Sequence, residues 1–243
     1  IMILGGFGFM IGTGGSALIA KTLGEGRHKL ANRYFSMLII MTVILGLFLT
    51  TIGIVFARRV SILLGATDVM LDDCVIYLRT VLLFISPFML QNVFQSFLVT
   101  AQKPHAGLIV TIIAGLTNMS LDALFIVVFR WGVAGAALST ILGQIIAMFI
   151  GLILNIKINK EITISPKGFR PNLGAIKRIY SVGIPSIVMQ SVSSVMTFGM
   201  NNILMVFSST ATAVFGVYFK LQSFVIMPVL GLNNGMVPVI SYN

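Results

Sequence analysis

Two long apolar runs separated by only three residues constrain the fold of this chain more than any other feature. The runs cover residues 106–129 and 133–156, and each is long enough to cross a bilayer as a helix. Arg130, Trp131 and Gly132 form the whole connection, so the two helices must make a tight antiparallel hairpin. An arginine and a tryptophan at the turn are typical of a membrane interface. The hairpin therefore predicts an all-α integral membrane protein.

The composition supports this class and excludes others. Hydrophobic residues make up 57% of the 243 residues and charged residues only 9%, whereas a soluble domain is about a quarter charged. The net charge of +10 resides mainly in loops between apolar runs, which indicates membrane orientation rather than a nucleic-acid partner. Cys74 is the single cysteine, so an internal disulfide and every multi-cysteine metal motif are excluded.

Further apolar runs extend the prediction to a polytopic bundle of seven spans. The first run carries six glycines, which favours close contact with other helices over exposure to lipid. The third contains Pro87, which is expected to kink it. These additional spans cover residues 1–20, 34–57, about 75–100, about 179–207 and about 211–241.

The distribution of basic residues predicts the orientation. If loop 21–33 is cytoplasmic and the spans alternate, cytoplasmic loops contain eleven Lys or Arg residues and outer loops contain three. Since cytoplasmic loops are usually the more positive ones, loops 21–33 and 157–178 are predicted to be cytoplasmic. The predicted location is the inner (plasma) membrane, which the chain crosses several times. The cytoplasmic set is Lys21, Arg27, Lys29, Arg33, Lys103, Lys157, Lys160, Lys167, Arg170, Lys177 and Arg178; the outer set is Arg58, Arg59 and Arg130.

One carboxylate lies inside the hairpin. Asp122 is the only acidic residue within any long apolar run, and acids in the membrane interior usually mark a path for an ion, a proton or a substrate. Asp122 precedes the turn by eight residues and Thr140 follows it by eight, so both lie about 12 Å inside the same face. Asn118 and Gln144 are one turn deeper on their respective helices. These four residues are the predicted site of cation or proton coupling, with Na⁺ at Asp122, Asn118 and Thr140 as one possibility.

Small side chains recur every four residues along the second helix of the hairpin. Such a stripe lets helix backbones approach closely in lipid and is first of all a packing surface. Its members are Gly135, Ser139, Gly143, Ala147 and Gly151.

Other polar side chains inside the spans are candidates for a substrate cavity. Gln91 and Gln95 lie one turn apart in the third span, and the sixth span has too many polar groups to face lipid. The predicted cavity residues are Gln91, Gln95, Gln190 and Asn201.

Three stretches of the chain resemble the MATE (multidrug and toxic compound extrusion) transporters. NMSLDALFIVVFRWGVAGAALSTILGQ, residues 118–144, resembles the segment of that family that usually reads N-x-x-LDP-x-F-I…G-x-x-GAA-x-AT-x-x-GQ. GTGGSALIAKTLGEG is similar to the end of its second helix, and GVYFKLQSFVIMPVLGLNNGMVPVI to its eighth.

The resemblance implies twelve helices in two pseudo-repeated six-helix lobes, of which this chain is an internal fragment with helices two to eight. Residues 1–156 would hold five helices of the first lobe, 157–178 the basic cytoplasmic link, and 179–243 the start of the second lobe with two helices.

The resemblance also implies roles for the hairpin residues. In members with a first-lobe cation site, the positions of Asn118, Asp122 and Thr140 bind the coupling ion, and a first-helix aspartate normally completes the site. This chain departs from the pattern at Ala123, where proline is common. Some members use a seventh-helix glutamate, but the corresponding span here has no acid. The implied ligands are Na⁺ or H⁺, with no other cofactor.

The predicted function is secondary active antiport that exports organic, cationic or multidrug compounds in exchange for Na⁺ or H⁺, by a protein that works as a monomer. A lipid-linked saccharide flippase of the same superfamily is the alternative, but it would need a broad cationic cavity, and the spans contain only Arg79 and Lys220, both near span ends. A passive channel stays open from composition. An intramembrane enzyme would need a paired acid, a metal cluster or an activated nucleophile, and none is evident, so no enzyme is expected.

Overall fold

The computed structural model describes residues 2–63, 66, 70–101, 103–159 and 172–242, except some side chains within α1, α7 and α8, among them that of Gln190. All regular structure in these ranges is helical, as predicted. The elements are α1 (Met2–Gly24), α2 (His28–Leu63), α3 (Leu71–Leu83), α4 (Ile85–Thr100), α5 (Pro104–Asp122), the π-helical segment η1 (Ala123–Val128), α6 (Gly132–Ile158), α7 (Leu173–Phe207) and α8 (Ser209–Tyr242).

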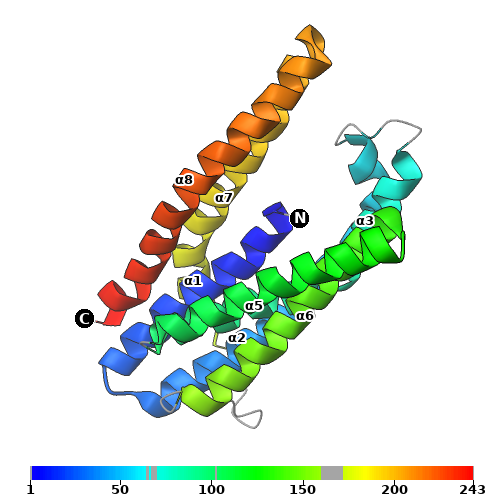
Figure 1. Cartoon of the computed structure of the whole chain (residues 1–243). Helices are drawn as coiled ribbons and strands as arrows, with labels where there is room; N and C mark the ends of the chain where they lie inside the picture. Colours follow the sequence, from blue (N-terminus) through cyan, green and yellow to red (C-terminus); the bar gives the residue numbers. More distant parts are fainter. Residues whose placement is uncertain (1, 64–65, 67–69, 102, 160–171, 243) are drawn as a thin grey trace.

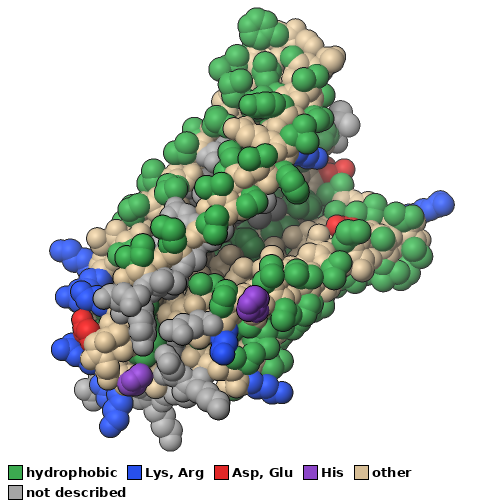
Figure 2. All heavy atoms as spheres, turned by 60° about the vertical axis from the view of Figure 1, so that its left-hand side comes forward, with side chains coloured by type: hydrophobic (Ala, Val, Ile, Leu, Met, Phe, Trp, Pro, Cys, Tyr) green, Lys and Arg blue, Asp and Glu red, His purple; other side chains and the backbone are tan. Residues whose placement is uncertain are grey.

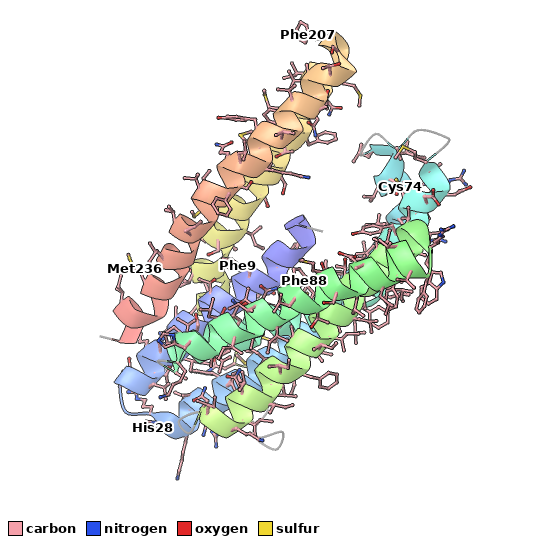
Figure 3. The ribbon with its side chains drawn as sticks, in the orientation of Figure 1. Phe9, His28, Cys74, Phe88, Phe207 and Met236 are labelled. Atoms are coloured by element: carbon pink, nitrogen blue, oxygen red, sulfur yellow. The ribbon has the colours of Figure 1, made fainter. Side chains whose placement is uncertain are left out.

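The helices form two arms that diverge from a common end (Figure 1). Helices α7 and α8 make one arm, α2 to α6 make the other, and α1 lies between them and packs against both. Figure 3 shows His28 and Met236 toward the end where the arms converge, and Cys74 and Phe207 toward the end where they separate. Successive spans therefore run in alternating directions when the bent pair α3–α4 and the continuous α5–η1 are each counted as one span.

The glycines of α1 bring it into backbone contact with its neighbours, as the sequence predicts. A Cβ atom added to Gly8 would lie 2.8 Å from Met89 Cα on α4, and one on Gly15 would lie 2.6 Å from Leu38 Cδ1 on α2. The largest buried apolar cluster surrounds this helix and joins residues of α1, α2, α4 and α7. Close packing replaces the hydrophobic effect as the driving force between helices in lipid, so α1 is the structural centre of the fold.

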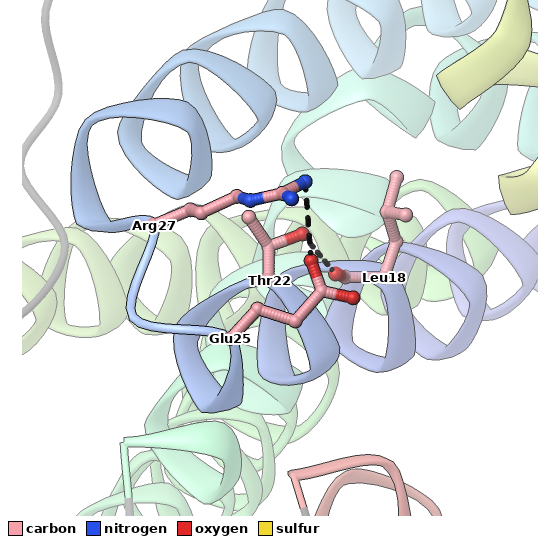
Figure 4. A network of polar contacts seen from close by, with 4 residues as sticks. All are labelled: Leu18, Thr22, Glu25 and Arg27. Carbon is pink, nitrogen blue, oxygen red and sulfur yellow. Dashed lines mark hydrogen bonds and ion pairs between the residues drawn. The ribbon is translucent and has the colours of Figure 1, made fainter.

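The turn between α1 and α2 is fixed by its own backbone. Gly26 has a φ of 74°, and Arg27 N donates to Thr22 O at 3.1 Å while Gly26 N donates to Leu23 O at 2.9 Å. This is the Schellman pattern, which satisfies the last carbonyls of a helix and favours glycine. Figure 4 shows the exposed ion pair between Arg27 and Glu25 beside it, at 3.4 Å, which contributes little in water.

The third predicted span is broken, as expected from its proline. Helices α3 and α4 meet at an angle of 50°, with Phe84 between them. Pro87 lies in the first turn of α4, where it cannot donate the hydrogen bond that would continue α3. Thr50 of α2 donates to Leu82 O at 2.8 Å, so one carbonyl at the break is satisfied from a neighbouring helix.

The connection between α6 and α7 falls mostly outside the described residues. Helix α6 continues to Ile158, and α7 begins at Leu173, where the Asn172 side chain accepts from Gly174 N at 3.0 Å and Ala175 N at 3.3 Å. The helices thus extend into both ends of the predicted loop 157–178. The division into lobes at residues 156 and 179 remains a prediction.

By length and mean hydropathy, four of the described helices can each cross a membrane, and the bent pair α3–α4 makes a fifth. Those four are α2, α5 with η1, α6 and α7. Apolar side chains cover both arms on the face shown in Figure 2, while Lys and Arg side chains gather toward one end. The crossing of the membrane by α1 and α8 stays a prediction from the sequence.

Candidate functional site

The hairpin of α5, η1 and α6 closes through a tight turn. Arg130 and Gly132 both have positive φ angles, of 56° and 55°. The Trp131 ring stacks on Phe125 with ring centroids 5.1 Å apart and lies 5.2 Å from that of Phe129. Arg130, between Phe129 and Trp131 of this aromatic cluster, therefore has a backbone conformation that is uncommon outside glycine.

The first helix of the hairpin changes its geometry directly after Asp122. The α-helix ends there and the six residues of η1 follow, with Phe129 N donating to Leu124 O at 2.9 Å across a five-residue interval. Such π-helical segments are rare and often occur at functional sites. The change from α-helix to π-helix falls at Ala123, where the MATE pattern has proline. In this chain the helix geometry therefore changes at that position although no proline is present.

The stripe of small residues on α6 is a packing surface, as predicted. A Cβ on Gly135 would lie 3.1 Å from Phe125 Cβ, and one on Gly143 would lie 3.3 Å from Asn118 Cβ. Further along the helix, a Cβ on Gly151 would lie 3.2 Å from Phe94 Cβ on α4. The stripe thus serves two neighbours in succession, η1 and α5 near the turn and α4 at the other end.

This close packing brings three of the predicted site residues together. Asn118 lies between Asp122 on its own helix and Thr140 on α6, and all three are partly buried. With its amide in one orientation, Asn118 Nδ2 donates to Thr140 Oγ1 at 3.5 Å. With the amide reversed, Nδ2 donates to Asp122 Oδ2 at 3.3 Å and Oδ1 accepts from Thr140 N at 3.2 Å. The reversed orientation satisfies both ends of the amide.

Ser139 is a member of the cluster that the sequence reasoning missed. Its Oγ donates to Asp122 Oδ1, lies 2.9 Å from Ala136 O, and is on a side chain with no exposed surface. The sequence placed Ser139 only in the packing stripe, and the MATE pattern has alanine at this position. The available signal was that Ser139 is the one polar member of a stripe that faces the helix carrying Asp122.

Gln144 does not join the cluster. It lies one turn beyond Thr140 and is partly buried, but it makes no hydrogen bond to the other predicted residues within the described part of the chain. The contact with Asn118 at this turn of α6 is made by its neighbour Gly143.

The predicted cavity residues lie on two helices, Gln91 and Gln95 on α4 and Gln190 and Asn201 on α7. Gln95 Nε2 donates to Thr111 Oγ1 at 2.8 Å, linking α4 to α5, and Gln91 Oε1 is buried without a hydrogen-bond partner among the described residues. Asn201 lies on α7, which packs mainly on α1 rather than on α4. The side chain of Gln190 is outside the described residues. A recess between the two arms is visible in Figure 2.

The chemistry of the cluster suits a hard monovalent cation or a proton. It offers a carboxylate, an amide and two hydroxyl groups, and oxygen ligands are those that hard cations prefer. No group of three or more His, Cys, Asp or Glu side chains occurs in the described ranges, so nothing there resembles a transition-metal centre.

Comparison with known proteins gives consistent matches. A family model described as MatE matches residues 1–124. The Multidrug export protein MepA of Staphylococcus haemolyticus (strain JCSC1435) is 27% identical over 241 residues, which covers 99% of this chain and 53% of that protein. MepA of Staphylococcus saprophyticus is 28% identical with the same coverage. The chain spans about half the length of the curated relatives it matches.

Solved structures show the same fold. A transporter of the MOP superfamily from Pyrococcus furiosus superposes with a TM-score of 0.87 at 23% identity, over 99% of this chain and 53% of that one. An outward-facing MATE family transporter gives 0.87 at 23% identity, over 99% and 55%. An inward-facing one gives 0.84 at 23% identity, over 95% and 53%.

Proposed function

The chain belongs to the MatE family of membrane transporters, and we propose that the protein containing it is a secondary active antiporter that exports organic, in particular cationic, compounds in exchange for Na⁺ or H⁺. Members of this family are transporters rather than enzymes. The multidrug export described for the MepA relatives supports the substrate class.

The observation that carries the proposal is the placement of Asp122. Its carboxylate is the only acidic group in the long apolar runs. At the junction of α5 and η1 it contacts Ser139 and Asn118, and Asn118 in turn contacts Thr140. A carboxylate at membrane depth is costly and persists where it serves an ion or proton path. A cation bound there compensates the negative charge of Asp122, and a proton removes it. The occupancy of this one residue therefore depends on the cation gradient for either ligand.

Reconstituted vesicles test this function. The full-length protein should expel a fluorescent organic cation when a Na⁺ or H⁺ gradient is imposed, and the gradient that drives efflux identifies the coupling ion. Efflux that follows the substrate gradient alone, unaffected by either cation gradient, would show a passive channel instead. Translocation of lipid-linked saccharide without export of organic cations would favour the flippase.

We also propose that loops 21–33 and 157–178 are cytoplasmic and that the turn 130–132 faces outward, in a plasma membrane. In support of this grouping, the turn between α1 and α2 and the end of α6 lie toward the end where the arms converge, and the turn between α5 and α6 lies at the opposite end. In a Cys74→Ser background, single cysteines in the two basic loops should react with an impermeant thiol reagent only from the cytoplasmic side. A cysteine at Trp131 should react only from outside. Labelling of loop 157–178 from outside would reject this orientation.

A further inference from the structure

Among the described residues, Ser139 is the residue of α6 whose side chain donates a hydrogen bond directly to the Asp122 carboxylate. The residue is completely buried, and its neighbours in the stripe, Gly135 and Gly143, hold α6 against η1 and α5. A serine in this stripe therefore has its hydroxyl pressed toward the opposite helix, where Asp122 Oδ1 accepts its hydrogen. Hydrogen bonds to an ionised group are about twice as strong as neutral ones.

The hydroxyl has two acceptors and one hydrogen. Ser139 Oγ lies within hydrogen-bond reach of both Asp122 Oδ1 and Ala136 O, and Thr140 Oγ1 also donates to Ala136 O at 2.9 Å. Because a serine carries a single O–H, it can satisfy only one of the two acceptors fully. The charged carboxylate is the stronger acceptor, and Ala136 O already accepts from Thr140. The Ser139 hydroxyl therefore donates its hydrogen bond to Asp122 while Asp122 is ionised.

This hydrogen bond fixes which carboxylate oxygen remains for the ion. With Oδ1 held by Ser139, Oδ2 is the oxygen that faces the Asn118 amide. A carboxylate without the serine would rotate about its last torsion, which is broad and nearly two-fold for aspartate. The pairing of Oδ2 with Asn118 would then be one of several arrangements.

We propose that Ser139 is a positioning residue of the coupling site, which holds Asp122 so that its second oxygen meets Asn118. The inference rests on the proposed function, because it assumes that Asp122 is the group that binds the coupling cation. It adds to that function a residue on α6 that ties the acid to the opposite helix of the hairpin.

Ser16 provides a matched control. It is 2% exposed, and its Oγ donates to the carbonyl three residues earlier, Thr13 O, at 2.9 Å. Ser139 is likewise buried and has the same local relation to Ala136 O, so the two serines differ in the Asp122 carboxylate that only Ser139 reaches.

The experiment uses the full-length transporter with Ser139→Ala, Ser16→Ala and Asp122→Leu, and with each serine change combined with Asp122→Leu. We expect Ser139→Ala to shift the concentration of driving cation needed for half-maximal efflux by about threefold or more, with the maximum rate within about twofold. Ser139→Ala should lower the Tm in the parent protein but not in the Asp122→Leu background, since the partner is then absent. Ser16→Ala should change the Tm equally in both backgrounds and leave the half-maximal concentration unchanged.

The outcomes separate the two proposals. Equal Tm changes for Ser139→Ala in both backgrounds, together with an unchanged half-maximal cation concentration, would reduce Ser139 to a packing residue while Asp122 kept its role. Gradient-driven efflux by Asp122→Leu would instead reject the coupling role of Asp122, whatever Ser139→Ala does.

Discussion

Asp122→Asn is expected to abolish gradient-driven efflux while the protein still inserts and folds. Asparagine keeps the size of the side chain and an oxygen that accepts from Ser139, so the packing of Gly135 and Gly143 against the first helix is preserved. The amide has no charge, so it can neither compensate a bound cation nor release a proton. Gradient-driven transport in reconstituted vesicles should fall to the level of protein-free vesicles. The Tm of the variant should stay close to that of the parent protein.

Neutral members of the cluster should matter less. Asn118→Ala and Thr140→Ala each remove one neutral donor or acceptor, worth about 1 kcal/mol, and should lower efflux by about fivefold. Asp73→Asn provides the control for the charge change, because Asp73 is exposed in the first turn of α3. It should transport like the parent. Parental efflux by Asp122→Asn would make Asp122 a structural residue.

Gly183→Ala is expected to have the second-largest effect, through the contact between α1 and α7. A Cβ on Gly183 would lie 2.5 Å from Met10 O, and on the opposite helix a Cβ on Gly14 would lie 3.3 Å from Gly183 N. Neither contact can relax by moving a flexible side chain alone, because both involve backbone. The added methyl group should force the helices apart at a cost of about 1–3 kcal/mol, which is about 5- to 150-fold in the population of this arrangement.

Gly199 is the matched position on the same helix. A Cβ there meets nothing within 4 Å, so Gly199→Ala should be neutral or slightly stabilising. We expect Gly183→Ala to lower both the Tm and the efflux rate and Gly199→Ala to lower neither. If the two variants behaved alike, the backbone contact between α1 and α7 would not stabilise this arrangement of helices.

The hairpin and the placement of Asp122 could be predicted because their signals are local. A three-residue connection leaves one topology for two apolar runs, and a four-residue period places small side chains on one face. Counting residues from the turn then gave the depths of Asp122 and Thr140, and the structure brings both to Asn118. The break near Pro87 followed from the missing backbone donor in the same way.

Other features depend on interactions that the sequence does not display. The π-helical segment after Asp122 arises where η1 packs on Gly135, and nothing in ALFIVV marks it. The role of Ser139 was hidden because serine also serves as a small packing residue. Gln144 has the right depth but makes no hydrogen bond to the cluster among the described residues, since depth along a helix does not determine the contacts of a side chain. The cavity of Gln91, Gln95, Gln190 and Asn201 stays a prediction, since α4 carries the first two residues and α7, which packs on α1, carries the other two.

Release of the coupling cation on addition of substrate tests the coupling at Asp122 most directly. Coupling between two ligands is reciprocal: if the bound cation weakens the binding of substrate, then bound substrate weakens the binding of the cation by the same factor. Purified full-length protein is loaded with the driving cation and mixed with an organic cation that it exports. Release is followed with radioactive sodium or with a pH-sensitive dye. The parent protein should release the cation and Asp122→Asn should release none; equal release from both proteins would contradict coupling at Asp122.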